Sequence, residues 1–264
     1  MLDNCVIKSA MKKLLLIGCL IFITACLSPS GGQPATPEPT PTPAATATRL
    51  IPTPVPATAT VTFTPSPTST PEPPPRFFTE EFDSAPAHWS TLYASGDASR
   101  IETLNQDGKL TFELYSSNAW LYAVYGAHEY DTVHMEASIE SIGSNTNYMG
   151  LICNYKEQEG WFEFNVSSDG SYTILYGQWL GEGVASYMPV ADGGSEYINI
   201  GNTTNEMGLD CLGDSLQLYI NGKLFRNIDV SRFEMEGGKV GLAVASFEEV
   251  PVILAFDWVK VSEP

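Results

Sequence analysis

The apolar and polar residues of the last two-thirds of the chain alternate as they do in β-strands. Residues 132–139 alternate at every position, and residues 161–166 and 216–221 do the same. Successive side chains of a strand point to opposite faces, so each segment has one apolar and one polar face. No stretch combines sustained helical spacing with capping residues, and no internal repeat is found. The pattern predicts an all-β domain.

Turn signals separate these segments. Asp107-Gly108, Asp169-Gly170 and Asn221-Gly222 are dipeptides that tolerate the positive φ angles of tight hairpins. Three such hairpins favour an antiparallel arrangement. About a dozen strands between residues 76 and 264, each with one apolar face, predict two packed sheets, that is, a β-sandwich.

The segment before this domain has a different composition. Residues 28–75 contain 15 prolines and 12 threonines. Such a segment cannot bury enough apolar surface to order itself, and proline biases it toward polyproline II. We therefore expect a disordered linker over residues 27–75, able to reach on the order of 150 Å at ~3.1 Å per residue.

The first 26 residues have the pattern of an export signal. Lys12 and Lys13 precede the apolar run 14–23, which is too short for the ~20 residues of a spanning helix. The run ends in Ile23-Thr24-Ala25-Cys26, which resembles the lipobox of bacterial lipoproteins. The resemblance implies that Cys26 is lipidated and becomes the mature N-terminus. Translation from either Met1 or Met11 is compatible with this signal.

The cysteines fit the same interpretation. Cys5 and Cys19 leave with the signal peptide and Cys26 takes the lipid, so Cys153 and Cys211 remain. Outside the cytoplasm two such thiols oxidise readily, and we expect a disulfide; two separate buried thiols are the alternative. The bridge would contribute roughly 3 to 4 kcal/mol in the chain-entropy model.

The charge excludes one class of partner. The chain has 31 acidic against 13 basic residues, a formal charge of −18. Nucleic-acid binding needs a cationic surface that displaces counterions from phosphate, so we expect no nucleic-acid partner.

Seven segments of the domain form a further pattern: residues 77–83, 150–155, 161–164, 168–172, 218–222, 238–242 and 256–261. In their order and spacing they resemble concanavalin A-like (laminin-G-like) jelly-roll domains, and the resemblance spans essentially all of residues 77–264. Similar domains follow a lipobox and a Thr/Pro linker in bacterial surface lipoproteins, and related ones are labelled 3-keto-disaccharide hydrolase domains. The resemblance implies the sandwich fold, which hosts lectins, adhesion modules and glycanases alike.

The same resemblance implies a candidate calcium site. Jelly-roll modules often bind calcium where the first and last strands meet, and here Glu81 and Asp83, next to Glu80, would face Asp257. Hard oxygen ligands suit this ion. No other cofactor signature is present.

The sequence does not predict a glycanase centre. Glucanases of this fold carry a Glu-x-Asp-x-x-Glu type motif, which is absent here. Retaining hydrolysis needs two carboxyl groups ~5 Å apart. Glu136 and Glu140 share a strand face about 13 Å apart, and we interpret them as solvated residues of a strand near a sheet edge. Convergence of carboxylates from different strands into an active site is the alternative that the sequence leaves open.

Aromatic residues beside polar ones predict a sugar-binding surface, because sugars present C–H faces and hydroxyl groups. Trp161 shares a strand face with Glu163 and Asn165, and Trp120 shares one with Tyr122. Trp179 lies in a glycine-flanked segment, followed by Tyr187. The alternative for each of these aromatics is packing inside or at the ends of the sandwich.

These expectations combine into one hypothesis. The protein would be lipid-anchored in a bacterial envelope of one or two membranes, touching the membrane only through its lipid. Its domain, residues 76–264, would bind a glycan or envelope polysaccharide without catalysis. A glycoside-acting hydrolase or lyase is the first alternative, and a protein-interaction or structural envelope module is the second.

Overall fold

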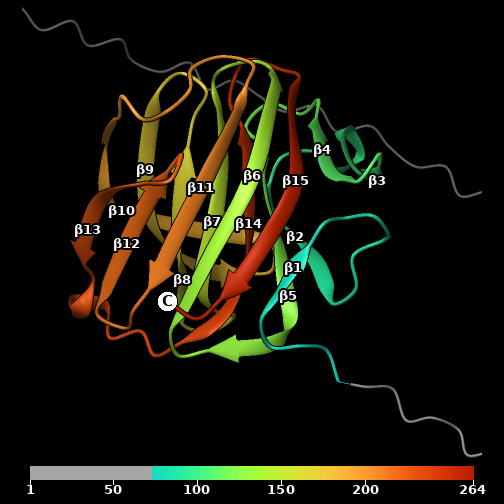
Figure 1. Cartoon of the computed structure of the whole chain (residues 1–264). Helices are drawn as coiled ribbons and strands as arrows, with labels where there is room; N and C mark the ends of the chain where they lie inside the picture. Colours follow the sequence, from blue (N-terminus) through green and yellow to red (C-terminus); the bar gives the residue numbers. More distant parts are fainter. Residues whose placement is uncertain (1–72) are drawn as a thin grey trace, which may run out of the picture. The chain divides into compact units, whose positions relative to one another are not determined.

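Fifteen strands and two 3-10 helices build residues 73–264, the part of the chain that the computed structural model describes (Figure 1). The expected signal peptide, the lipidated Cys26 and nearly all of the expected linker lie outside these residues. No helix of the described part is long and apolar enough to cross a membrane.

The strands form two antiparallel sheets, so the predicted β-sandwich is confirmed. Sheet A has the order β13 (Lys223–Asp229), β12 (Ser215–Ile220), β11 (Thr204–Cys211), β6 (Val133–Gly143), β15 (Val252–Ser262), β4 (Lys109–Leu114) and β3 (Ile101–Gln106), with β1 (Phe78–Glu80) also paired to β15. Sheet B has the order β10 (Val184–Gly194), β9 (Ser171–Gly181), β8 (Gly160–Val166), β7 (Asn147–Lys156), β14 (Gly238–Ser246), β5 (Trp120–Tyr130) and β2 (Trp89–Ser95). The 3-10 helices are η1 (Ala98–Arg100) and η2 (Ser231–Phe233).

The apolar face of each strand meets the other sheet. Phe162, Phe164 and Val166 of β8 are fully buried in the same cluster as Met135 and Ile139 of β6. Each such side chain contributes about 1.5 to 3 kcal/mol on leaving water. The alternation that predicts the strands therefore also assigns their inner faces.

Two of the predicted turns have the expected geometry. Asp107 and Gly108, between β3 and β4, have φ angles of 55° and 70°. Asn221 and Gly222, between β12 and β13, have φ angles of 48° and 72°. Positive φ at both central residues is the type I′ turn that matches the twist of a hairpin.

The last residues assigned to the linker are held by the sandwich. His128 of β5 donates from Nε2 to the carbonyl of Pro74 at 2.9 Å, and the hydroxyl of Tyr130 donates to the carbonyl of Arg76 at 2.7 Å. The sandwich therefore holds the chain by a hydrogen bond at Pro74, two residues before the predicted boundary.

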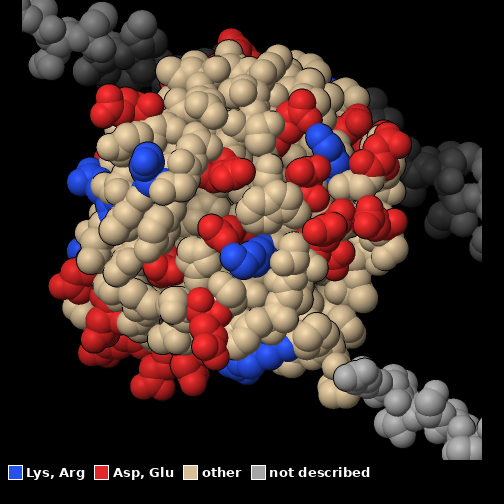
Figure 2. Space-filling model, viewed as in Figure 1, with Lys and Arg blue, Asp and Glu red and all other residues tan. Residues whose placement is uncertain are grey.

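Acidic groups dominate the surface. Residues 76–264 carry 28 acidic and 9 basic side chains. Figure 2 shows this excess on the outer face of sheet A, where acidic groups outnumber basic ones. This face is not suited to polyanionic partners.

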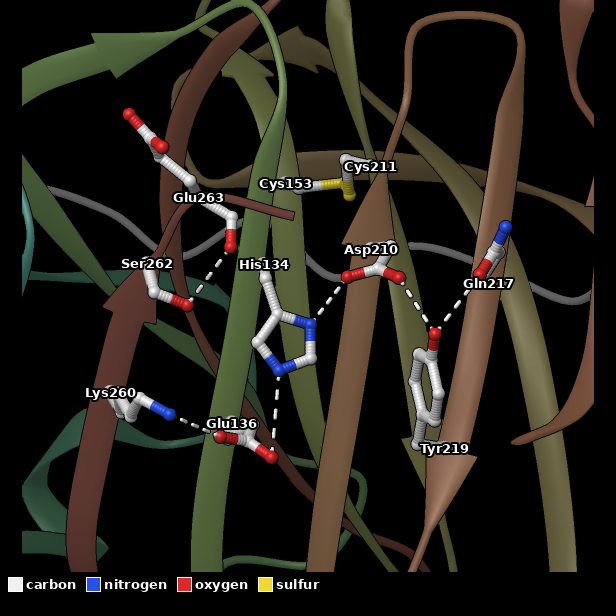
Figure 3. Close-up of polar contacts among 10 residues, drawn as sticks. All are labelled: His134, Glu136, Cys153, Asp210, Cys211, Gln217, Tyr219, Lys260, Ser262 and Glu263. Carbon is white, nitrogen blue, oxygen red and sulfur yellow. Dashed lines mark hydrogen bonds and ion pairs between the residues drawn. A yellow bond between two sulfur atoms is a disulfide. The ribbon is translucent and has the colours of Figure 1, made fainter. Parts of the chain in front are cut away.

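A disulfide joins the two sheets. Cys153 lies on the inner face of β7 and Cys211 on that of β11, with their Cα atoms 6.6 Å apart (Figure 3). Both side chains are buried. The link connects residues 58 positions apart in the sequence.

We predict that replacing both Cys153 and Cys211 by alanine lowers the free energy of unfolding by about 3 to 4 kcal/mol, because the unfolded chain regains the entropy of a closed loop. Urea unfolding of both proteins measures this difference. When the protein is alkylated without prior reduction, mass spectrometry should find Cys153 and Cys211 unmodified because both are held in the disulfide. Free thiols at Cys153 and Cys211 in the purified protein would contradict the prediction.

Candidate functional site

Seven polar and aromatic residues singled out in the sequence come together on the outer face of sheet B. They face away from the core and are contributed by β5, β8, β9 and β10. The seven are Trp120, Tyr122, Trp161, Glu163, Asn165, Trp179 and Tyr187. They are adjacent because neighbouring strands of an antiparallel sheet place their outward side chains in rows.

Glu163 is the centre of this group. Its side chain has no solvent exposure, yet both carboxylate oxygens are hydrogen-bonded. Trp120 Nε1 and Asn165 Nδ2 donate to Oε1 at 3.0 and 2.7 Å. Tyr122 OH and Trp161 Nε1 donate to Oε2 at 2.9 and 3.2 Å. All four donors are neutral, and we call this arrangement the Glu163 cage.

The cage extends through a second tyrosine. The hydroxyls of Tyr122 and Tyr187 lie 2.8 Å apart. An ionised carboxylate only accepts, so Tyr122 donates to Glu163 and in turn accepts from Tyr187. The ring of Tyr187 stacks on Trp120 with centroids 4.8 Å apart. The hydrogen bonds and the stacking therefore hold the same side chains.

Burial shifts the protonation equilibria of the cage. It raises the pKa of Glu163, although the hydrogen bonds from Asn165, Trp161, Tyr122 and Trp120 act in the opposite direction. Burial, followed by the charge of Glu163, also raises the pKa of Tyr122 and Tyr187. Both tyrosines are therefore neutral hydrogen-bond donors at neutral pH.

Trp161 is not the exposed platform that its strand face suggests. Its side chain has no solvent exposure. The indole lies over Gly177 of β9, where a Cβ atom would come within 2.4 Å of the ring. The rings of Tyr122 and Trp179 cover it further, with centroids 5.2 and 5.1 Å away. For Trp161 the packing alternative is correct.

The two edges of sheet B approach each other across this face. Strands β2 and β10 lie at opposite ends of the sheet order, yet some of their Cα atoms are within 8 Å of each other. The face is therefore strongly curved. Together with the Glu163 cage, this curvature fills the middle of the face with the protein's own side chains.

A groove of about 870 Å³ remains open beside Trp179. Its aromatic lining is Tyr93, Tyr155 and Trp179, and its polar lining includes Glu157, Gln158 and Glu182. The indole N–H of Trp179 donates to the hydroxyl of Tyr155 at 3.0 Å, which fixes the ring. We call this the Trp179 groove.

Sequence reasoning missed most of the lining of this groove. Tyr155 is the clearest example, because simple alternation would put it on the inner face with Cys153. Asn154 has a φ angle of 52°, and the register of β7 against β8 shifts between Cys153 and Lys156. This bulge turns Tyr155 outward. The one local signal of this bulge in the sequence is Asn154, because asparagine tolerates positive φ.

A second hollow of about 460 Å³ lies at the other end of the same face. Tyr148, Asp169 and Phe247 are among the residues that line it. Tyr148 and Phe247 are in edge-to-face contact, with ring centroids 4.9 Å apart. The outer face of sheet B thus has a closed centre and two open ends.

The four hydrogen-bond partners of Glu163 are all neutral groups. None of its hydrogen-bond partners is a second carboxyl group. Glu136 and Glu140, on β6 in sheet A, pair with Lys260 at 3.0 Å and Lys109 at 2.8 Å. Strand β6 lies between β11 and β15 rather than near an edge, so that part of the sequence interpretation is wrong.

The expected calcium ligands do not assemble. The first and last strands do pair, with Glu80 opposite Val259. Among residues 73–264, however, no three His, Cys, Asp or Glu side chains lie together so that they could hold a metal ion. Glu81, Asp83 and Asp257 therefore do not form the predicted cluster, because strand pairing alone does not converge their oxygens.

Solved structures share this architecture at low sequence identity. No protein-family model and no curated protein matches the chain. A glycoside hydrolase family 16 endo-glucanase from Bacteroides ovatus has a TM-score of 0.51 at 13% identity, covering 70% of this chain and 99% of its own. The laminarinase catalytic domain of Thermotoga maritima has a TM-score of 0.52 at 10% identity, covering 71% and 97%. At these identities the likeness shows a shared jelly-roll fold.

We predict that Glu163→Gln lowers the free energy of unfolding by about 2 to 4 kcal/mol. The amide nitrogen of the glutamine replaces one carboxylate oxygen and cannot accept, so two of the four donors lose their acceptor. The difference in free energy of unfolding between the native protein and this variant should narrow as pH rises. A raised pKa means that the folded state holds the proton more tightly than the unfolded chain, so the native protein loses stability above about pH 4.3 until the folded pKa is passed.

Urea unfolding between pH 4 and 8 measures this trend, and Glu136→Gln is the control. Burial opposes a lowered pKa at Glu136, but the hydrogen bond from Lys260 and the influence of His134 outweigh it. The contribution of Glu136 to stability is therefore complete above about pH 5 and declines only at lower pH. If the difference in free energy of unfolding between the native protein and Glu163→Gln widened as pH rises, the account would be contradicted.

Proposed function

We propose that this protein is an exported, lipid-anchored surface protein whose sandwich binds a glycan in the Trp179 groove without hydrolysing it. The Trp179 groove is the observation that carries the proposal. It combines an ordered indole and two phenol rings with carboxylate and amide groups at one open concave surface. This is the chemistry that sugars require, since their C–H faces pack on rings and their hydroxyl groups need acceptors and donors.

The charge of the groove narrows the ligand. Glu157 and Glu182 are the charged side chains of its lining. Their carboxylates accept hydrogen bonds from hydroxyl groups and repel anionic polymers. Uncharged polysaccharides are therefore the ligands that we propose, ahead of uronate or sulfate polymers.

The absence of catalysis is part of the proposal, and the Glu163 cage supports it. A carboxylate that is fully buried and engaged on both oxygens by neutral donors is not available as a nucleophile or as an acid at an open cleft. The structural neighbours include a family 16 protein of the Bacteroides ovatus mixed-linkage glucan locus in complex with a product. Hydrolysis by this chain, of that type or of the 3-keto-disaccharide type, is therefore the competing outcome to be measured.

Export and anchoring are supported by the sequence alone. The basic flank at Lys12 and Lys13, the apolar run 14–23 and the sequence up to Cys26 agree with one another. A proline-rich linker after Cys26 would hold the sandwich away from the membrane. In this arrangement the groove meets polysaccharides of the envelope or the surroundings.

We predict that Cys26→Ala prevents lipid attachment. Mass spectrometry of the purified proteins should find the mass of the lipid on the native protein and not on the variant. Cys19→Ala, which changes a cysteine of the apolar run, is the matched control and should be lipidated like the native protein. Lipid on Cys26→Ala would contradict the proposed anchor.

We predict that Trp179→Ala and Tyr93→Ala each weaken glycan binding roughly tenfold, about 1.4 kcal/mol. Tyr93 and Tyr197 offer a matched comparison, because their side chains are 39% and 41% exposed and only Tyr93 lines the groove. Titration calorimetry of the native protein against a panel of neutral glucans and envelope polysaccharides first identifies the ligand. Tyr197→Ala should then bind it like the native protein.

The same samples test for hydrolysis. Reducing ends should not increase during incubation of the protein with the ligand. Release of reducing ends that Glu163→Gln abolishes would replace the binding proposal by the hydrolase alternative. Absence of binding at millimolar sugar would favour the protein-interaction alternative.

A further inference from the structure

The outer face of sheet A has a hollow of about 420 Å³, on the opposite sheet from the Trp179 groove. It lies over β6 and β11, in the middle of the face shown in Figure 2. None of the residues considered so far as sugar ligands takes part in it.

Gly208 of β11 makes the floor of this hollow. In the strand register it stands between Glu136 of β6 and Tyr219 of β12. A Cβ atom at this position would lie 3.0 Å from the Cβ of Tyr219. The missing side chain therefore leaves a depression between the two neighbouring strands.

Aromatic rings stand on both sides of the depression. Tyr219 on β12 and Trp258 on β15 line it, three strand spacings apart, or roughly 14 Å. Trp258 faces outward because the register against β6 shifts between Phe256 and Trp258, with Asp257 as the extra residue. Phe256 and Val259 on either side of this bulge are buried in the core.

A hydrogen-bonded network fixes one end of the hollow (Figure 3). His134 Nδ1 is hydrogen-bonded to Asp210, and the hydroxyl of Tyr219 donates to the other oxygen of Asp210 at 2.8 Å. His134 Nε2 lies 3.5 Å from Glu136, whose other oxygen accepts from Lys260 at 3.0 Å. The Tyr219 ring is therefore held in place before any ligand arrives.

Three polar groups of the lining are left for a ligand. The carboxylates of Glu206 and Glu263 and the indole N–H of Trp258 form no hydrogen bond or ion pair within residues 73–264. Glu206 is exposed and Trp258 is half-buried. Two free acceptors, one free donor and two rings thus surround a ligand-sized space.

We propose that this hollow, here called the Trp258 hollow, binds a sugar unit that carries a free amino group. The rings at Trp258 and Tyr219 offer apolar faces to a pyranose and attract an ammonium group placed over them. Glu206 supplies a charge-assisted hydrogen bond to the same group. Carboxylates of Glu136, Asp210 and Glu263 add to the negative potential, while the one lysine of the network, Lys260, is paired with Glu136.

This inference is independent of the proposed glycan binding in the Trp179 groove. It concerns the other sheet, other residues and a cationic rather than an uncharged ligand. Either site can fail without affecting the other.

The test is titration calorimetry of the full chain with a glucosamine tetramer and with its N-acetylated counterpart, which has the same length and no charge. We expect the glucosamine tetramer to bind at least tenfold more tightly. Trp258→Ala should weaken this binding at least tenfold and Glu206→Gln about fivefold, whereas Tyr197→Ala, at an exposed tyrosine that lines neither site, should leave it unchanged. Raising the salt from 50 to 500 mM should weaken binding of the charged tetramer.

Three results would overturn the proposal. The first is no binding of either tetramer at millimolar concentration. The second is equal binding of both tetramers, which would remove the role of the amino group. The third is unchanged binding by Glu206→Gln; because this side chain is exposed, the variant should fold normally and remain informative even if Trp258→Ala does not fold.

Discussion

A carboxylate can be buried in a protein only if its oxygens are hydrogen-bonded, and Glu163 imposes this condition on the whole outer face of sheet B. Four neutral donors from β5 and β8 meet it. Each of these donors is thereby fixed in orientation, and Trp120 and Trp161 have their indole N–H groups turned inward. The aromatic rings of the face are consequently placed by hydrogen bonds as well as by packing.

The same interaction decides where the face is open. The cage and its rings occupy the centre, and the face is hollowed at its two ends, at the Trp179 groove and at Tyr148. The fold is shared with glycoside hydrolases of family 16, and the central carboxylate here has no solvent exposure and is hydrogen-bonded on both oxygens. The middle of this face thus forms a second cluster of buried side chains outside the main core.

Much of this fold could be predicted because it depends on local pattern. Alternation assigns residues 161–166 to the correct faces, since the period of a strand is two. Burial of a side chain, in contrast, depends on neighbouring strands. Trp161 is covered because Gly177 on the next strand leaves room for its ring. Bulges are equally hidden, and the extra residue Asp257 brings Trp258 to the outer face where simple alternation would place it with the core. The side chains that line the two proposed binding sites therefore include some that are exposed where the sequence pattern is interrupted.

The indole N–H signals of the five tryptophans, in a ¹H–¹⁵N spectrum recorded during titration with the bound glycan, test the central claim directly. Trp179 lines the open groove, whereas Trp120 and Trp161 donate to Glu163 inside the closed centre. The account predicts that the Trp179 signal moves with ligand concentration while the other two stay in place. Movement of the Trp120 and Trp161 signals with a stationary Trp179 would show that the sugar enters the centre of the face, and would contradict the account.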